Sequence, residues 1–524
     1  MKQTNLSRFY APDYYGPHSN ISRSSPLDRI SRADISPDNV WRLAGETRGK
    51  MSLWREIRLL VYVVSEHIPS SPVLNNAYTY TFFCQVVQRI LKLLQLHNEY
   101  GPLVRIGPNE VSISDWRYYR AIYSNNKASS KEPGFYLPIV FADQHNIFCM
   151  TNKEEHAARR KISASPYSLQ SMTRLEPMIR SKADNLAKRL LEISSSATTG
   201  TVNAFLLCGL FSLEVVCKAG FGKEFPFEDT KDLTELLQAM DGSAPTFILD
   251  GLLPWLRPTG FAHKIPFFGE PYQCRRTWEQ KSRALLREFL QLPDKDNGYF
   301  ISPYLSSVDS FLGRKMNHEE FLEEAMGIMF AGSGTTSSTL AYLMYALSRP
   351  GYEAIQTRLR AELEDGGESV SELRKLPYLN AVIKETFRLY PTIISSLPRV
   401  LDEPMKVHGI DLPVGTVVNM QNYVHHRNPE VFPDPESFNP DRWLSPHADM
   451  ESSLTPFSLG RRACIGLNLA WDELYIAVSS VFRNLELRLG DEMTEEDMEL
   501  EDRFNIAPVG RKLMLKVSMV KKLL

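Results

Sequence analysis

The chain has 524 residues, of which 43% are hydrophobic and 23% charged, and its formal net charge is −2. This length allows an extensive core in one large domain or two, and the composition is that of an ordinary globular protein. The balanced charge argues against binding to a polyanion, so we expect no nucleic acid partner.

The six cysteines show neither a CxxC pair nor a regular spacing. This distribution argues against a disulfide framework or a structural zinc site, and it favours a reducing compartment. Five of them lie among apolar or mixed residues, and we interpret those five as small buried hydrophobes. The sixth, Cys464, lies in a different context. The five are Cys84, Cys149, Cys208, Cys217 and Cys274.

The first 75 residues show no clear transmembrane helix. The most apolar stretch begins at Ile57, but it contains Arg58 and is followed by Glu66. It is therefore shorter than the roughly 20 apolar residues that a spanning helix needs. The polar start also lacks the apolar core of a signal peptide. We predict a poorly ordered leader over residues 1–75 and a folded domain over residues 76–524.

Regular structure is predicted to begin near Tyr80 with an amphipathic helix that ends at a Gly-Pro pair. Residues 103–114 follow as a short hairpin, because apolar residues alternate on both sides of a Gly-Pro-Asn turn. Residues 154–193 carry two amphipathic helical patterns, and residues 205–216 are apolar enough to be buried on several sides. The sequence therefore predicts a mainly α fold with a small β region.

Residues 245–271 differ from the helical segments around them. Large apolar residues mix with several prolines, which prevent a long helix, so we predict an apolar loop. Two interpretations stay open. The loop either packs against the core, or it forms an exposed apolar surface that contacts a membrane or admits an apolar substrate.

Asn317 begins a long helical pattern that continues to Pro350, with Glu320 placed to complete a capping box. Such a helix is about 50 Å long. Its middle, residues 332–336, gathers Gly, Ser and Thr, which are poor helix formers. We expect the backbone there to be opened or closely approached by a neighbour.

The strongest chemical signal is the stretch FSLGRRACIG over residues 457–466, which precedes a helical pattern. Cys464 therefore stands at a helix start, where backbone N–H groups and two preceding arginines stabilise a thiolate. Gly460 and Gly466 permit a tight turn and the close approach of a flat cofactor. Without this context, a lone cysteine at a helix start is more often a buried structural thiol.

The spacing F-x-x-G-x-R-x-C-x-G resembles the cysteine-ligand loop of the cytochrome P450 superfamily. This resemblance, which extends from about Tyr100 to the carboxyl terminus, implies the cytochrome P450 fold with haem b as cofactor. It makes Cys464 the axial ligand of the haem iron. Residues 103–114 and 425–443 look like those of fungal members. The matched positions of the loop are Phe457, Gly460, Arg462, Cys464 and Gly466.

The resemblance also assigns a structural ion network. Glu385 and Arg388 form an E-x-x-R pair one helical turn apart, and Arg442 stands where the family has a third partner. By itself an E-x-x-R pair is usually a solvated surface pair. Its order and distance from Cys464 agree with the family, which implies a buried network that is structural rather than catalytic.

Residues 331–336, AGSGTT, resemble the family's oxygen-activation segment, with Thr335 as the matched threonine. The resemblance implies that the Thr335 hydroxyl helps to deliver protons during dioxygen cleavage. A threonine that only packs against a neighbouring helix is the alternative. The chain departs from the family at Gly334, because an acidic residue often precedes the threonine. Proton delivery then differs, or another group supplies it.

Three arginines are implied as partners of the two haem propionates, for which a guanidinium is well suited. Arg160 belongs to a stretch in which His156 replaces the tryptophan of a W-x-x-x-R pattern. Arg399 follows the E-x-x-R helix, and Arg462 belongs to the cysteine loop. As plain sequence, each would more often be a surface charge.

The implied activity is monooxygenation, in which one atom of O2 enters an apolar small molecule and NADPH–cytochrome P450 reductase supplies the electrons. Fungal members with such substrates, including terpenoids, polyketides, alkaloids and fatty-acid-like molecules, often serve secondary metabolite biosynthesis. We expect substrate contacts from residues 127–147, 245–271, the region of Ala331 and residues 393–396.

The reductase is expected to dock on the cysteine side, where Arg159, Lys161 and Arg461 offer positive charge to an acidic partner. The resemblance places such an enzyme at the endoplasmic reticulum membrane surface. Because no anchor is visible in this sequence, peripheral membrane contact, a soluble protein and a truncated or mispredicted start all stay open. Two other functions also stay open, a haem-thiolate isomerase or dehydratase that acts without a reductase and a non-catalytic haem-binding protein.

Overall fold

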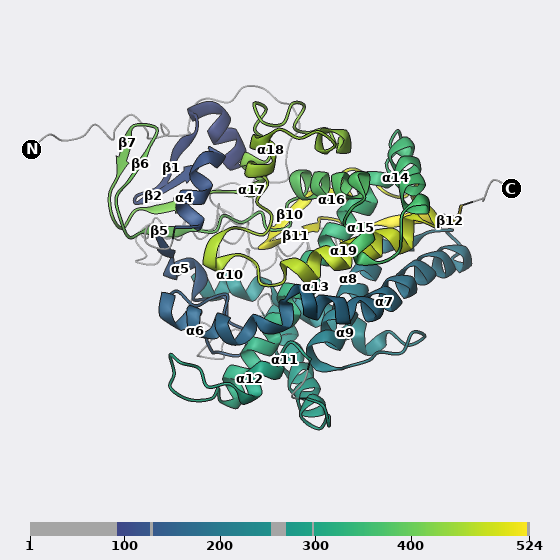
Figure 1. Ribbon diagram of the computed structural model, residues 1–524, viewed down its shortest axis with the longest axis horizontal. Helices are drawn as coiled ribbons and strands as arrows, with labels where there is room; N and C mark the ends of the chain where they lie inside the picture. Colours follow the sequence, from purple (N-terminus) through teal and green to yellow (C-terminus); the bar gives the residue numbers. More distant parts are fainter. Residues whose placement is uncertain (1–91, 126–128, 253–268, 296–297, 521–524) are drawn as a thin grey trace, which may run out of the picture.

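The computed structural model describes residues 92–125, 129–252, 269–295 and 298–520. The predicted leader, Cys84 and the start of the first predicted helix lie outside the described residues. That helix is present over residues 92–100. The prediction of a mainly α fold with a small β region is confirmed (Figure 1).

The helices surround one long central helix, α13. In chain order they are α4 (Tyr119–Tyr123), α5 (Pro133–Tyr136), α6 (Lys153–Ser163), α7 (Leu169–Ser196), α8 (Ala204–Phe221), α9 (Lys231–Ser243), α10 (Pro245–Leu252), α11 (Gly269–Leu290), α12 (Ser302–Ser306), α13 (His318–Ser348), α14 (Glu353–Asp365), α15 (Val370–Leu373), α16 (Pro377–Leu389), α17 (Asn422–His425), α18 (Ala448–Ser453) and α19 (Leu467–Phe482).

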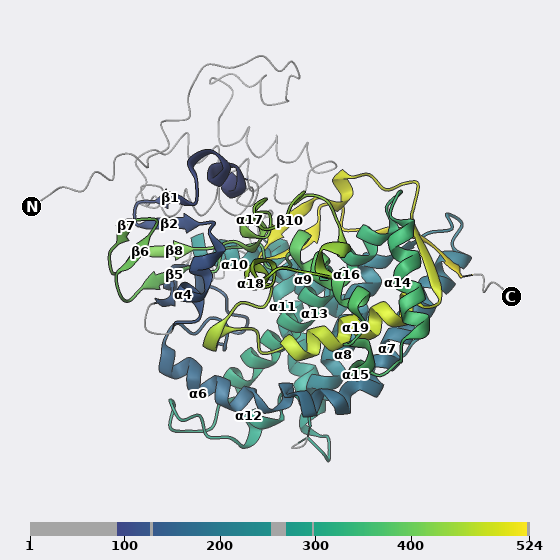
Figure 2. The ribbon, with the colours of Figure 1, turned by 45° about the horizontal axis from the view of Figure 1, so that its top comes forward.

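The strands form small sheets. The largest has the order β1–β2–β8–β5–β3 and lies, with the β6–β7 hairpin, at the left of Figures 1 and 2. A second sheet has the order β4–β12–β9, and β10 pairs with β11. Their bounds are β1 (Leu103–Gly107), β2 (Glu110–Ile113), β3 (Ser129–Lys131), β4 (Val202–Asn203), β5 (Arg399–Leu401), β6 (Met405–Val407), β7 (Ile410–Leu412), β8 (Val417–Asn419), β9 (Leu485–Leu489), β10 (Leu500–Arg503), β11 (Asn505–Pro508) and β12 (Met514–Met519).

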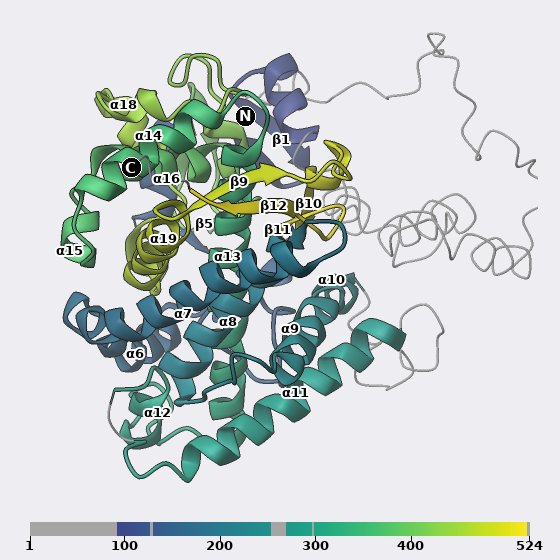
Figure 3. The same cartoon turned by 90° about the vertical axis from the view of Figure 1, so that its right-hand side faces the viewer.

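Helix α13 passes through the centre of the molecule and packs most extensively against α8 (Figure 3). Almost every residue of α8 is apolar and buried, as the sequence predicted, because neighbouring helices cover it on all sides. Within the described residues, α8 alone has the length and hydropathy of a membrane span, and 83% of it is buried inside the protein. Its composition is that of a core helix.

The predicted capping box begins α13. The Asn317 side chain accepts a hydrogen bond from the Glu320 N–H, and the Glu320 carboxylate accepts one from the Asn317 N–H. The helix is continuous through residues 332–336, so the backbone is not opened there. It is closely approached instead, because a Cβ at Gly332 would lie 2.6 Å from Val216 on α8.

The prediction of a loop over residues 245–271 is wrong at both ends. Residues 245–252 form α10, and α11 begins at Gly269. Pro245 and Pro271 each stand in the first turn of a helix, where the missing N–H costs nothing because it would have no intrahelical partner. Residues 253–268 lie outside the described residues.

Candidate active site

The loop that carries Cys464 is shaped by its glycines. A short 3-10 turn over Gly460–Arg462 leads into it, and the Cys464 N–H donates to the carbonyl of Phe457 at 2.9 Å. Gly460 has a φ of +73°, and a Cβ there would lie 2.6 Å from the carbonyl oxygen of Tyr123. Only glycine fits both the conformation and the contact. The cysteine is thereby held immediately before α19.

Cys464 faces an internal cavity rather than the protein core. Of the five described cysteines, Cys149, Cys208 and Cys217 are buried and Cys274 is partly buried, whereas the Cys464 side chain is exposed. Its exposed surface lines a cavity of about 290 Å³. Although this surface faces the cavity, the protein around the thiol desolvates it and so raises its pKa, and the Gly466 backbone and the charge of Arg160 oppose that rise.

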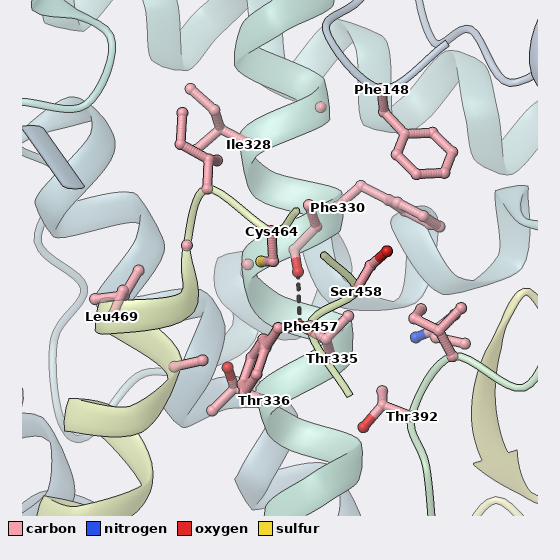
Figure 4. Close-up of a pocket in the computed structure, with 18 of the residues that line it drawn as sticks. Phe148, Ile328, Phe330, Thr335, Thr336, Thr392, Phe457, Ser458, Cys464 and Leu469 are labelled. Atoms are coloured by element: carbon pink, nitrogen blue, oxygen red, sulfur yellow. Dashed lines mark hydrogen bonds between the residues drawn. The ribbon is translucent and has the colours of Figure 1, made fainter. Parts of the chain in front are cut away.

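The opposite wall of the cavity is the middle of α13. Figure 4 shows Cys464 facing the stretch that carries Phe330, Thr335 and Thr336. The Thr335 hydroxyl donates to the carbonyl of Ala331 at 2.8 Å. Most other lining side chains are apolar, and they include Ile139, Phe141, Phe148, Val216, Ile328, Leu397, Phe457, Leu469 and Phe504.

A cluster of cations lies near this cavity, and two of its members are cross-strand partners. Lys131 on β3 is opposite Arg399 on β5, and the two side chains are 6% and 4% exposed. Arg399 donates to the Tyr136 hydroxyl at 2.6 Å and to backbone carbonyls, and Lys131 donates to the carbonyl of Phe148. Like charges directly opposite each other are destabilising.

Two further arginines complete the cation cluster. Arg462 donates to the backbone carbonyls of residues 150–152, and Arg160 donates to the carbonyl of Ala463 at 2.7 Å. Burial, followed by the charge of Arg399, lowers the pKa of Arg462 to about 10. None of the four cations forms an ion pair with a carboxylate within the described part of the chain.

The positive charges of this cluster shift the pKa values of neighbouring groups. Burial and then the charges of Arg399 and Arg462 hold the pKa of Lys131 well below its usual value. Burial and then Arg462 and Lys131 lower the pKa of His156 to about 2. Such a cluster is costly unless an anionic ligand pairs with it. Together with a thiol facing a mainly apolar cavity, it fits the iron and the two carboxylates of a haem.

The E-x-x-R pair and Arg442 come together away from solvent. Arg388 donates to both oxygens of Glu385, at 2.9 and 2.8 Å, and Arg442 donates to one of them at 3.1 Å. Glu385 and Arg388 are completely buried. Between them in sequence, Phe387 packs edge-on against Phe457, with ring centroids 5.3 Å apart. The network therefore supports the position of the cysteine loop.

Arg159 does not offer its charge to a partner, which corrects the docking prediction. It is buried and pairs with Asp309 at 3.1 Å and Glu324 at 2.5 Å. Lys161 and Arg461 are exposed. A short basic stretch does not show which of its cations face solvent, because successive residues of a helix such as α6 point alternately toward the core and toward solvent within one turn.

Only some of the segments that we expected to contact substrate line the cavity. Residues 139–147, the region of Ala331 and Ile393 contribute to its lining. Residues 394–396 and α10 contribute no side chain to it among the residues described. Lys131 was not anticipated as part of the cation cluster, since no motif marks a single lysine and only its strand pairing brings it to Arg399.

Comparison with known proteins gives one consistent family. The family model described as Cytochrome P450 matches residues 71–515. The chain is 30% identical over 455 residues to the cytochrome P450 monooxygenase TRI4 of Fusarium sporotrichioides, covering 80% of this chain and 83% of that protein. It is 27% identical over 466 residues to a tryptophan 6-hydroxylase of Fusarium equiseti, covering 84% and 90%. The structure of retinoic acid bound cyanobacterial CYP120A1 matches with a TM-score of 0.67 at 20% identity, covering 81% and 93%.

Proposed function

The chain belongs to the cytochrome P450 family of haem-thiolate monooxygenases, and on that premise we propose that Cys464 is the axial ligand of its haem iron. The observation that carries this proposal is the exposure of Cys464 into a cavity whose opposite wall bears Thr335. When bound there, haem would supply the iron centre for oxygen chemistry, and the Cys464 thiolate would donate electron density to it.

Arg160, Arg399 and Arg462 hold the haem propionates in this proposal, and Lys131 is added to them. The support is the cluster of positive charge that forms no ion pair with any described carboxylate. The hydrogen bonds from Arg160 and Arg462 to backbone carbonyls hold their guanidinium groups in one orientation. Their remaining N–H groups are therefore already oriented before the propionates bind. Pairing with two carboxylates would remove the repulsion between Lys131 and Arg399.

Thr335 acts in proton delivery. Its hydroxyl hydrogen is donated to Ala331, which leaves the oxygen lone pairs facing the cavity as acceptors. A water or reacting group that donates to this oxygen can pass a proton on when the hydroxyl turns from Ala331 into the cavity. The residue therefore switches between accepting and giving a proton without any change of net charge.

The substrate is an apolar small molecule, because the cavity wall is formed mainly by aliphatic and aromatic side chains. Phe504 packs against Phe148 with ring centroids 5.3 Å apart, which gives one wall a rigid aromatic surface. Similar fungal proteins include a tryptophan 6-hydroxylase, an N-acetyltryptophan 6-hydroxylase and several cytochrome P450 monooxygenases. These likenesses support a place in secondary metabolite biosynthesis.

The electrons come from NADPH–cytochrome P450 reductase, which docks on the cysteine side. Lys161 and Arg461 are the exposed cations that support this assignment. Residues 76–524 form the haem domain, and contact with a membrane is peripheral.

Gly334 also favours one second function, rearrangement or dehydration of an oxygenated substrate without a reductase, because the usual acid is absent. Turnover without NADPH would identify that reaction.

The test is the absorption spectrum of the reduced, carbon-monoxide-bound protein, compared between the native chain and Cys464→Ser. We expect a strongly red-shifted Soret band in the native protein and its loss in the variant. Cys274→Ser is the matched control, because that cysteine is outside the cavity, and it should leave the band unchanged. A band that survives Cys464→Ser would exclude Cys464 as the ligand.

A further inference from the structure

The place of the missing acid at Gly334 is taken by a side chain from another part of the chain. A Cβ built on Gly334 would lie 2.6 Å from the side-chain nitrogen of Asn505, the first residue of β11. Asn505 and Thr335 both line the cavity. An amide therefore lies against the residue that precedes the threonine, close to where a carboxylate side chain at position 334 would begin.

The fold fixes the backbone of β11 at this place. The Ile506 N–H donates to the carbonyl of Thr392 at 2.8 Å, and the Ser338 hydroxyl of α13 donates to the carbonyl of Ile506 at 2.8 Å. Asn505 also forms an isolated bridge with Ile393. Because α13 itself holds the next residue, the amide stays next to Gly334 and its approach does not depend on a flexible loop.

The amide is available to a ligand in the cavity. Among the residues described, no side-chain hydrogen bond involves the Asn505 amide, and the residue is only partly buried. An asparagine amide carries two N–H donors and an oxygen acceptor. Leaving it unpaired against a mainly apolar wall is unfavourable unless water or another polar group pairs with it.

We propose that Asn505 is a positioning residue that holds a water beside Thr335 and so replaces the carboxylate that the family often has before the threonine. The inference rests on the proposed function of Thr335. For each proton that Thr335 passes into the cavity, the held water gives one proton to Thr335 and regains one from the next water and ultimately from solvent. Asn505 is unchanged, because a neutral amide fixes the water but does not exchange charge with it.

The first experiment measures the contact without turnover, through melting temperatures in a double-mutant cycle. Gly334→Ala gains helix propensity, but its Cβ forces the amide from its place. Its effect on the melting temperature should therefore be about 2 °C less favourable in the native background than in an Asn505→Ala background. Gly332→Ala is the matched control, since its Cβ would meet Val216 at the same 2.6 Å, and Asn505→Ala should not relieve it. An equal effect of Gly334→Ala in both backgrounds would overturn the contact.

The second experiment measures hydrogen peroxide released per NADPH consumed. Asn505→Leu keeps a similar volume without polar atoms, and we expect peroxide release to rise about fivefold while the carbon-monoxide spectrum stays unchanged. Asn505→Asp should restore coupling near that of the native protein and make it depend on pH, whereas the native coupling should show no carboxylate titration. Gly334→Ala should uncouple the native protein but add nothing to Asn505→Leu.

Thr335→Ala distinguishes the proton-delivery role of Thr335 from the water-positioning role of Asn505. If Thr335→Ala uncouples the enzyme and Asn505→Leu does not, Thr335 keeps its role and the inference about Asn505 is wrong. If neither variant releases more peroxide, the proton relay through Thr335 fails, and the role of Asn505 fails with it. Uncoupling by both, with rescue by Asn505→Asp, supports the positioning role.

Discussion

Two buried clusters of charge in this protein are built in opposite ways. Around Glu385, one carboxylate accepts hydrogen bonds from Arg388, Arg442 and the indole of Trp443. Around Arg399, cations meet only carbonyl and hydroxyl oxygens. The first cluster is complete within the chain, whereas the second becomes complete only with an anion from outside. Charge balance therefore separates a structural network from a binding site, although both clusters are built on arginines.

The largest effect should follow from breaking the complete cluster. Glu385→Ala leaves the fully buried Arg388 guanidinium without its carboxylate, at a cost of about 3–5 kcal/mol in the free energy of unfolding. We expect little or no folded, haem-loaded protein. Lys384→Ala on the same helix is the control, since its partner Glu451 is exposed and the pair contributes at most about 1 kcal/mol. Denaturant unfolding of both variants would refute the distinction if their stabilities matched.

The incomplete cluster should respond in the opposite direction. Burial and neighbouring cations lower the pKa of Lys131, so the unfolded chain binds this proton more tightly than the folded chain does. The stability of the haem-free protein should therefore rise with pH toward about 10.5, the ordinary lysine value, and Lys131→Met should remove that rise. The same variant should weaken haem retention about tenfold, because a charge-assisted hydrogen bond is lost.

Melting of the haem-free protein at neutral and alkaline pH checks the first effect, and transfer of haem to an excess of a haem-binding protein checks the second. A variant that lost stability in the haem-free state would show that Lys131 is already compensated. The contrast with Glu385→Ala is one of sign, since removing a charge harms the complete cluster and relieves the incomplete one.

The sequence predicted those parts of both clusters that lie within local motifs. The Glu385–Arg388 pair is one helical turn apart, and the Cys464 loop needs its glycines at fixed spacing. A few consecutive residues are therefore enough to predict each of these features. The Asn317 capping box and the buried α8 follow from the same kind of local rule. The described architecture agrees with these predictions.

The remaining contacts are long-range and carry no local signal. Lys131 reaches Arg399 through strand pairing, and Asn505 reaches Gly334 because β11 is held against α13. Arg159 looked like a surface cation, but Asp309 and Glu324 come to it from distant parts of the chain. The prolines at 245 and 271 predicted a loop, because a single window does not show that each begins a helix.

A smaller change at the cavity would sharpen the distinction between holding haem and using it. Thr335→Ala should leave the carbon-monoxide spectrum intact but lower product formed per NADPH about tenfold, with hydrogen peroxide released in its place. Thr335→Ser retains the hydroxyl that now donates to Ala331, and it should keep most of the coupling. Equal coupling in Thr335→Ala and the native protein would remove Thr335 from proton delivery.

Glu473 is a buried carboxyl group that we expect to stay protonated rather than pair with a cation. Its substitution should have the smallest effect on stability of the changes considered. This residue of α19 is fully buried, and burial raises its pKa well above 4.5, with the Thr336 hydroxyl opposing the rise. The folded state therefore keeps a proton that the unfolded chain loses, so stability falls as pH rises above about 4.5. Glu473→Gln keeps the shape without the titration. Its melting temperature should match the native value near pH 4.5 and exceed it by about 1–3 °C at pH 8. Parallel pH profiles of the two proteins would mean that Glu473 is ionised and compensated, as Glu385 is by its arginines.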